Sequence, residues 1–166
     1  MAMTELLSDA QLEDIGEALP KGMERRLALR LLTQWRDLCA GRAFPAFSDI
    51  NPADLDDMWP NCFVLDTEGF ETDPVFRIVG DVIAAKFDDS LIGKRVSFVP
   101  PGNLFYVATS YFSAVMQKEA PISRGGEFIS EHGDRILYRS VLLPVSDDGI
   151  SISGILGGAN CRKMDD

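Results

Sequence analysis

Three cysteines and a single histidine are the side chains here with the most distinctive chemistry. Cys39, Cys62 and Cys161 are odd in number and lie far apart, and no two of them have the C-x-x-C spacing of a zinc ribbon. His132 stands beside Gly133 in a turn-like segment, and one histidine with scattered aspartates does not supply the converging ligands of a metal site. The sequence therefore predicts no disulfide framework and no metal site, and it predicts that His132 is a solvated turn residue.

Acid–base chemistry has two candidate carboxylates, Asp66 and Asp81. Either one, beside a tyrosine, could act as a general base in a small α+β cone-fold enzyme. That chemistry needs an acid–base pair in a dry cleft, and nothing in the spacing requires one. The phosphate-binding pattern G-x-x-x-x-G-K-[ST] is missing. We therefore expect no enzymatic activity and keep the cone-fold enzyme as an alternative.

The whole chain has 166 residues, of which 46% are hydrophobic, enough for one domain with a core and an appendage. Its 26 acidic and 16 basic residues give a net charge of −10, and no basic cluster offsets it, so nucleic-acid binding is not expected. The N-terminus is acidic, unlike a secretion signal. The uncharged run over residues 96–117 contains prolines and hydroxyl side chains, unlike a membrane span. We expect a cytoplasmic protein without membrane contact.

Four segments have helical patterns. Residues 8–19 have capping-box spacing, and residues from about 22 to 40 carry a stronger apolar stripe at helical intervals. A short helix is expected over residues 52–58 behind the cap Asn51, and a long central helix over about 103–118. Two helices therefore precede the main part of the domain.

Five shorter segments are predicted strands. They cover residues 62–67, 75–80, 122–129, 136–145 and 150–161. In the second segment Arg77 is expected to face water, which places Phe76 and Ile78 on the inner face. Two strands, a helical interlude and three more strands predict an α+β fold, in which a single five-stranded antiparallel sheet has helices on one face.

This order of elements resembles the PAS fold, and three local strings resemble small stand-alone bacterial PAS proteins. The strings are WRDLCAGRAFPAFSDINP, FRIVGDVIAAKFDDSLIGK and YRSVLLPVSDDG, and together they span Trp35 to Gly149. The resemblance implies a sensory or interaction domain with a cleft between the sheet and the central helix, often dimeric through its N-terminal helices. It divides the chain into an N-terminal helical extension, residues 1–42, and a PAS-like domain, residues 43–166.

A short string near the end, from Gly158 to Arg162, matches the G-x-N-C-R part of the flavin-adduct loop of LOV photosensors, a branch of the PAS superfamily. In those domains the loop lies before the central helix. Here Cys161 lies at or just past the last predicted strand, and residues 90–101, which correspond to the loop, contain no cysteine. We therefore expect no flavin. Because His132 lies in a hairpin turn, we also expect no haem.

The predicted ligand site is the cleft between the sheet and the central helix. Tyr138 and Ser140 are expected on its inner face, with Arg139 facing out, and a buried hydroxyl needs a hydrogen-bond partner from a ligand, a water or a backbone carbonyl. The alternative is a plain core of aromatic side chains. The predicted lining is Phe76, Ile78, Phe105, Tyr111, Phe112, Tyr138, Ser140 and Leu142.

The apolar stripe of the second helix must also be covered. Its predicted interface residues are Leu31, Leu32, Trp35 and Leu38. They either pack on the protein's own sheet or form a symmetric dimer in which the same face meets its mate. In the last strand, Gly157 and Gly158 are expected to permit a bulge or the close approach of a neighbouring element.

These observations favour a cytoplasmic sensory or regulatory module of the PAS type. It would bind a small ligand in the cleft and act on a separate signalling protein or on its own second copy, as a homodimer. The first alternative is a protein-interaction adaptor without a ligand, whose core is filled by side chains. The second is the cone-fold enzyme.

Overall fold

The computed structural model describes residues 25–164, and the helix predicted over residues 8–19 lies outside them. Five strands form one antiparallel sheet in the spatial order β2-β1-β5-β4-β3. They are β1 (Cys62–Asp66), β2 (Val75–Val79), β3 (Ile122–Ile129), β4 (Arg135–Val145) and β5 (Gly154–Lys163). The predicted α+β class and five-stranded antiparallel sheet are confirmed.

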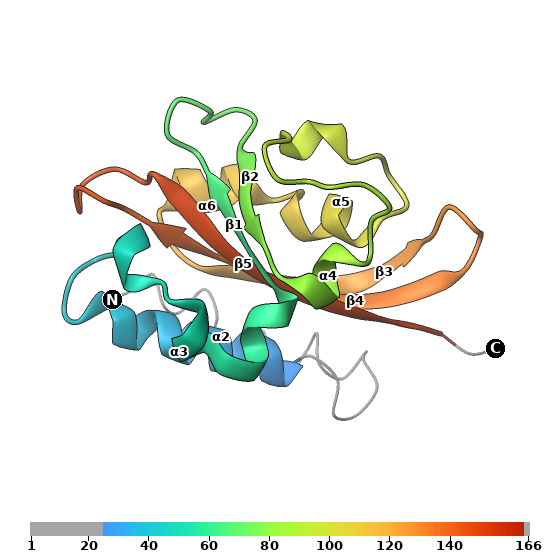
Figure 1. Ribbon diagram of the computed structural model, residues 1–166, viewed down its shortest axis with the longest axis horizontal. Coiled ribbons are helices and arrows are strands. Elements are labelled where there is room, and N and C mark those ends of the chain that lie inside the picture. The colour runs from blue at the N-terminus through green and yellow to red at the C-terminus, as the bar shows by residue number, and fades with distance from the viewer. Residues whose placement is uncertain (1–24, 165–166) are drawn as a thin grey trace.

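Helices lie on both sides of this sheet (Figure 1). The α-helices are α2 (Arg25–Cys39), α3 (Pro52–Leu55), α4 (Asp81–Ala84), α5 (Leu104–Thr109) and α6 (Phe112–Lys118). Three 3-10 helices accompany them: η2 (Phe47–Asp49), η3 (Asp56–Asn61) and η4 (Val96–Phe98). The helices α5 and α6 cover one face, as predicted, and α2 crosses the other. Within residues 25–164, no helix has the length and apolar character needed to cross a bilayer.

Two hydrophobic layers sandwich the sheet, and they share its central strands. The inner cluster lies between the sheet and α5–α6 and is built around Phe63, Leu65, Phe76, Phe105, Tyr111, Leu142 and Ile155. The outer cluster lies between the sheet and α2 and is built around Leu31, Leu32, Trp35, Val64, Val141, Leu143 and Leu156. Because both faces of the central strands are covered, residues 140–145 of β4 are buried without alternation.

The helix α2 is held on the outer face by one polar contact and one close approach. The indole nitrogen Nε1 of Trp35 donates a hydrogen bond to the carbonyl of Pro144 in β4, at 2.8 Å. Leu31 packs so closely over Gly158 of β5 that a Cβ there would lie 2.7 Å from its Cδ2 atom. The helix therefore shares a core with the sheet across the boundary predicted at residue 42.

The predicted dimer face is corrected by this packing. Leu31, Leu32 and Trp35 are buried against the protein's own sheet, and only Leu38 is half-buried. A side chain that is buried in the outer cluster can meet a second copy only if the helix leaves the sheet. The alternative in which the stripe packs on its own sheet holds for these three residues.

A β-bulge corrects the prediction for β2. Leu65 pairs with Phe76 whereas Val64 pairs with Ile78, so Arg77 is an extra residue between the two pairs. The alternation of side chains between the two faces is interrupted there. Ile78 therefore lies on the outer face beside Val64 and is 39% exposed, while Phe76 stays in the inner cluster. Ile78 is therefore not part of the predicted cleft.

The predicted central helix is broken into α5 and α6. The hydroxyl of Thr109 donates to the carbonyl of Phe105 at 2.7 Å, and the hydroxyl of Ser110 donates to the carbonyl of Val107 at 2.9 Å. Such back-bonding competes with the helical ladder and bends helices. The chain leaves helical geometry at Tyr111, whose φ is −108° and ψ 22°, before α6 begins.

Gly157 lets a side chain approach the inner face of β5 closely, as Gly158 does for Leu31 on the outer face. Phe63 lies directly opposite Gly157, and a Cβ on Gly157 would lie 2.3 Å from the Phe63 ring. Because Phe63 is fully buried, its ring has no free space to move into. The predicted close approach at Gly157 and Gly158 is therefore confirmed on both faces.

We expect Gly157→Ala to destabilise the fold by about 1–3 kcal/mol, because the added methyl overpacks the inner cluster against Phe63. Gly126→Ala is the matched control, since a Cβ on this β3 glycine meets its nearest atom, in Tyr138, at an ordinary 3.7 Å. It should change stability by less than about 1 kcal/mol. Urea unfolding followed by circular dichroism measures both, and equal losses would contradict this account.

Candidate functional site

The inner cluster occupies the position of the predicted cleft, and three phenyl rings fill its centre. Phe63, Phe76 and Phe105 contact one another edge to face, with ring centroids 5.5–6.0 Å apart. All three side chains are fully buried. Edge-to-face packing of this kind stabilises aromatic clusters beyond the burial of their area. The structure therefore brings together the predicted lining residues Phe76 and Phe105 as parts of a packed core.

Two of the three hydroxyl-bearing residues predicted to line the cleft are hydrogen-bonded to each other. The hydroxyl of Tyr111 lies 2.6 Å from Oγ of Ser140, and either oxygen can be the donor. Tyr111 is 3% exposed, and burial raises the pKa of its phenol well above the usual range, so the hydroxyl stays protonated. The hydrogen-bond partner that we expected Ser140 to need is supplied by the helix break that places Tyr111 over β4.

The remaining predicted lining residues lie around this pair. Leu142 is fully buried in the inner cluster, while Phe112 and Tyr138 are half-buried at its rim. The guanidinium carbon of Arg124 lies 5.0 Å from the centroid of the Tyr111 ring and covers it from the edge of the sheet. Burial raises the pKa of Tyr138.

Arg139 corrects one further expectation. We expected it to face water, but it is only 1% exposed on the outer face of β4. The reason is the second hydrophobic layer: a strand covered on both faces has no solvent-facing side. Its neighbours Ser140 and Tyr138 still point to the inner face, as predicted.

Cys161 and His132 lie where the sequence predicted. Cys161 is in β5, opposite Tyr138, and its half-buried side chain packs at the rim of the inner cluster. His132 lies in the β3–β4 turn with its side chain 81% exposed, 3.9 Å from Glu131. Burial raises the pKa of Cys62 to about 12, which keeps that thiol protonated and unreactive.

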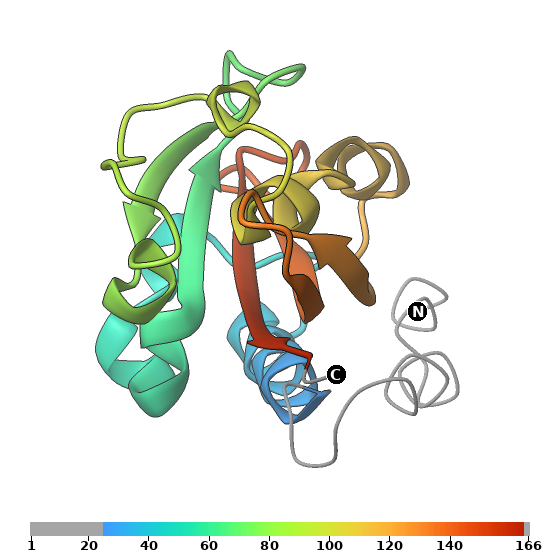
Figure 2. The same cartoon turned by 90° about the vertical axis from the view of Figure 1, so that its right-hand side faces the viewer.

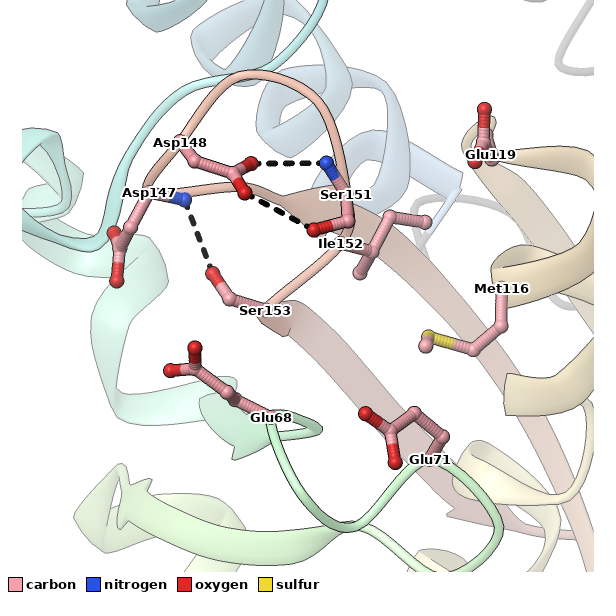
Figure 3. Close-up of a pocket in the computed structure, with 9 residues that line it drawn as sticks. All are labelled: Glu68, Glu71, Met116, Glu119, Asp147, Asp148, Ser151, Ile152 and Ser153. Carbon is pink, nitrogen blue, oxygen red and sulfur yellow. Dashed lines mark hydrogen bonds between the residues drawn. The ribbon is translucent and has the colours of Figure 1, made fainter.

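The structure also forms an acidic pocket that the sequence did not reveal (Figure 3). It has a volume of about 370 Å³ and lies between the β1–β2 loop, the end of α6 and the β4–β5 turn. Its lining residues are Glu68, Glu71, Met116, Glu119, Asp147, Asp148, Ser151, Ile152 and Ser153. From the sequence, only the wall formed by the turn Ser146–Gly149 could have been predicted. The other walls come from distant segments of the chain.

Asp148 organises the turn that forms this wall. Its carboxylate accepts the backbone N–H groups of Ile150 and Ser151 at 2.8 and 2.9 Å, and the hydroxyl of Ser146 at 3.0 Å. These hydrogen bonds lower the pKa of Asp148 to about 2, the bond from the Ser151 N–H contributing most. The pocket wall is therefore a hydrogen-bonded turn whose central carboxylate is ionised near neutral pH.

A second hollow, of about 450 Å³, lies between α2 and the segment that follows η2. Arg30 pairs with Asp57 beside it, at 2.6 Å, and each side chain is largely exposed. This ion pair is solvated and contributes little to stability. The hollow is lined by Leu29, Arg30, Thr33, Gln34, Asp54, Leu55, Asp56 and Met58.

Neither hollow is lined by the candidate residues Asp66, Asp81 or His132. In the part of the chain that the structure describes, no three His, Cys, Asp or Glu side chains are grouped to hold a metal ion. The carboxylate of Asp66 accepts the N–H of Glu68 at 3.1 Å in a turn, and Asp81 is exposed at the first turn of α4. Neither candidate base is hydrogen-bonded to a tyrosine among the described residues.

Phe63 is the site residue that the sequence interpretation missed. It occupies the centre of the inner cluster, opposite Gly157, but its position in a short apolar strand did not distinguish it from its neighbours. The signal that could have identified it is the unbroken apolar run Cys62–Leu65, which indicates a strand buried on both faces.

This fold agrees with the comparison to protein families. A family model described as a PAS domain matches residues 23–158. The chain therefore belongs to the PAS domain family, as its sequence resemblance predicted. No curated protein sequence matches the chain at a significant level.

Among solved structures, the chain is similar to the LOV domain from Erythrobacter litoralis EL346 blue-light activated histidine kinase. The identity is 9%, covering 62% of this chain and 95% of that one, with a TM-score of 0.47. It is similar to the PAS domain of Bordetella pertussis BvgS at 18% identity, covering 68% and 82% of the two chains, with a TM-score of 0.41. The light-state Aureochrome1 LOV domain matches at 12% identity over 70% and 90%, with a TM-score of 0.47.

We expect Tyr111→Phe and Ser140→Ala each to cost about 1–2 kcal/mol of stability, because each leaves the other buried hydroxyl without its partner. The double variant should cost less than the sum of the two, since it leaves no unpaired hydroxyl. Tyr106→Phe, at an exposed tyrosine of α5, should change stability by less than about 0.5 kcal/mol. Additive losses in urea unfolding would contradict the pairing.

The Asp148 turn predicts a pH dependence. Because the folded-state pKa is about 2 and an unfolded aspartate titrates near about 3.9, the stabilisation is complete above about pH 4 and is lost as the pH falls toward 2. Asp148→Asn should therefore be less stable than the wild type near neutral pH, and the difference should shrink between pH 4 and 2. Urea midpoints across this range test it, with Asp88→Asn as the control for losing one exposed charge.

Proposed function

We propose that this PAS domain is a sensory or regulatory module that acts through contacts with other proteins, and that its own side chains fill its interior. The observation that carries this proposal is the inner cluster, in which Phe63, Phe76 and Phe105 occupy the space between sheet and helices. It favours the ligand-free form of the function over the form with a small molecule in the cleft.

The polar groups of the interior support the same conclusion. A binding pocket usually presents polar groups that await a ligand, but the hydroxyls of Tyr111 and Ser140 already bond to each other at 2.6 Å. A flavin would have to displace the three phenyl rings, and a haem would need an axial ligand that His132, exposed in its turn, does not offer. We therefore propose that the domain works without a flavin or haem.

The strand β4 connects the two faces through which such a module would communicate. Ser140 and Leu142 point into the inner cluster, while Val141 and Leu143 point into the outer cluster against α2. One residue further on, the Pro144 carbonyl accepts the Trp35 hydrogen bond. A change of packing on one face therefore shifts the strand on which α2 rests, which is the two-sided coupling that a regulatory domain requires.

The remaining properties fit a protein-binding role in the cytoplasm. The net charge of −10 opposes contact with nucleic acid, and we propose a separate signalling protein or a second copy as the partner. Cys39 and Cys62 are buried free thiols, which suits a reducing compartment. The enzyme alternative has no support in the positions of Asp66 and Asp81.

Mass spectrometry of the denatured, purified protein tests the ligand-free interior. We expect no small molecule in stoichiometric amount, because the inner cluster leaves no room for one. A compound that co-purifies with the wild type and is lost from Ser140→Ala would overturn the proposal in favour of a ligand sensor.

A cavity variant sharpens this test. Phe105→Ala opens the inner cluster, at a cost of about 3–5 kcal/mol, and should gain binding of benzene, because an apolar cavity stays dry and accepts such probes. Phe98→Ala, which removes an exposed ring from η4, is the matched control and should bind none. NMR shift changes on adding benzene measure the binding. If the wild type responds as Phe105→Ala does, its interior is open and the proposal fails.

A further inference from the structure

The two edges of the sheet differ in whether another segment is hydrogen-bonded to them. The edge at β2 is covered by the segment after α4: Phe76 N–H donates to the Lys94 carbonyl at 2.9 Å, and Gly93 N–H donates to the Phe76 carbonyl at 2.8 Å. The opposite edge is β3, which pairs with β4 alone among the described elements. Figure 2 shows the sheet running from the green strands at one side to the orange strands at the other.

The hydrogen-bond pattern of the β3–β4 hairpin fixes which groups lie on the open edge. Ser130 N–H donates to the Asp134 carbonyl at 2.8 Å, so that pair is hydrogen-bonded. In an antiparallel ladder the bonded pairs alternate, so the odd-numbered residues of β3 point their N–H and C=O groups outward. Among residues 25–164, no backbone hydrogen bond reaches those groups of Ser123, Gly125 or Glu127.

The open stretch is limited at both ends. Pro121, just before β3, has no N–H to donate. At the other end the loop at Gly102 lies against Ile129, since a Cβ on Gly102 would be 3.4 Å from the Ile129 carbonyl oxygen. The pairing edge is therefore the stretch from Ser123 to Glu127, whose centre is Gly125.

We propose that this edge pairs with the same edge of a second copy of the chain, antiparallel, with the two-fold axis at Gly125. Ser123 then faces Glu127 of the second copy, and Gly125 faces Gly125. This register joins every outward N–H and C=O group of the open stretch to its counterpart. Exposed sheet edges are templates for such pairing, and a two-fold interface must be self-complementary.

The side chains of β3 favour this register over the registers with the two-fold axis at a nearby residue. A two-fold axis at Arg124 would oppose two arginines, and an axis at Glu127 would oppose two glutamates, which is unfavourable. An axis at Gly126 would pair Ser123 with Ile129 of the second copy, but the loop at Gly102 already lies against the Ile129 carbonyl. With the axis at Gly125, Ile122 faces Phe128 of the second copy, a favourable aromatic and β-branched pair.

The charges on β3 are also turned away from the edge. Arg124 lies over the ring of Tyr111 in its own chain, 5.0 Å from the centroid. Glu127 is held by Arg135 of the neighbouring strand at 3.1 Å. Charged side chains that point inward or along the edge would block pairing, but these two are engaged on the faces of the sheet.

This dimer deepens the proposed function by naming a second copy as one protein partner. Each copy carries a net charge of −10, so the two repel each other at low salt. Screening weakens that repulsion, and the dimer should therefore become tighter as salt is added. The interface is essentially one strand from each copy, so we expect a weak dimer that dissociates on dilution.

Sedimentation equilibrium of the full chain, over a concentration series at low and high salt, tests whether the dimer forms. Two variants that place opposite charges at Ser123 test the register. Ser123→Lys places a lysine opposite Glu127 of the second copy and should tighten the dimer about fivefold. Ser123→Glu opposes two like charges and should weaken it about fivefold. Ser90→Lys and Ser90→Glu, at an exposed loop residue, make the same changes of net charge and are the matched controls.

Gly125→Pro provides a second test, since it removes the central outward N–H and leaves the β3–β4 ladder intact. It should weaken the dimer at least about tenfold, with circular dichroism checking that the domain is folded. A monomer at every concentration and salt overturns the dimer, as does a dimer on which the Ser123 variants act no differently from the Ser90 controls. Either result leaves the ligand-free interior untouched, because that proposal is tested separately, by mass spectrometry of the denatured protein and by benzene binding.

Discussion

Two adjacent glycines in β5 let both faces of the sheet be packed closely. Gly157 accepts the Phe63 ring on the inner face, and Gly158 accepts Leu31 of α2 on the outer face. Successive residues of a strand point to opposite faces, so a glycine pair opens one space on each side. Strands without such space would hold the ring and the helix further from the sheet, and both hydrophobic clusters would lose contacts.

The proposed function rests on how these two clusters share β4 and β5. With Phe63 seated over Gly157, three phenyl rings close the interior, and the helix break at Tyr111 supplies the hydrogen bond that Ser140 needs. The same strand carries the Pro144 carbonyl that anchors Trp35 of α2. The strand β4 thus contacts both clusters, and the coupling that we propose runs through it.

Most of the fold could be predicted because it depends on local patterns. Four strands lie within one residue of their expected bounds, and the fifth begins at Gly154 instead of residue 150. Asn51 accepts the N–H of Ala53 as the predicted helix cap, and the PAS family is the one the strings indicated. The misses have two causes. The bulge at Arg77 and the burial of Arg139 depend on strands far along the chain, which periodicity within one segment does not register. The break at Tyr111 follows local back-bonding by Thr109 and Ser110, which an apolar stripe does not reveal.

The sequence by itself determined the order and type of the elements, the absence of a cysteine from residues 90–101 and the acidic charge of the chain. These follow from residue type and spacing alone. Only the tertiary structure decided that the apolar stripe of α2 covers the sheet, that Ile78 leaves the inner face, and that Phe63, Phe76 and Phe105 pack against one another. Such choices depend on which distant surfaces meet and how closely, because burial and close packing are properties of pairs of segments and not of any one of them.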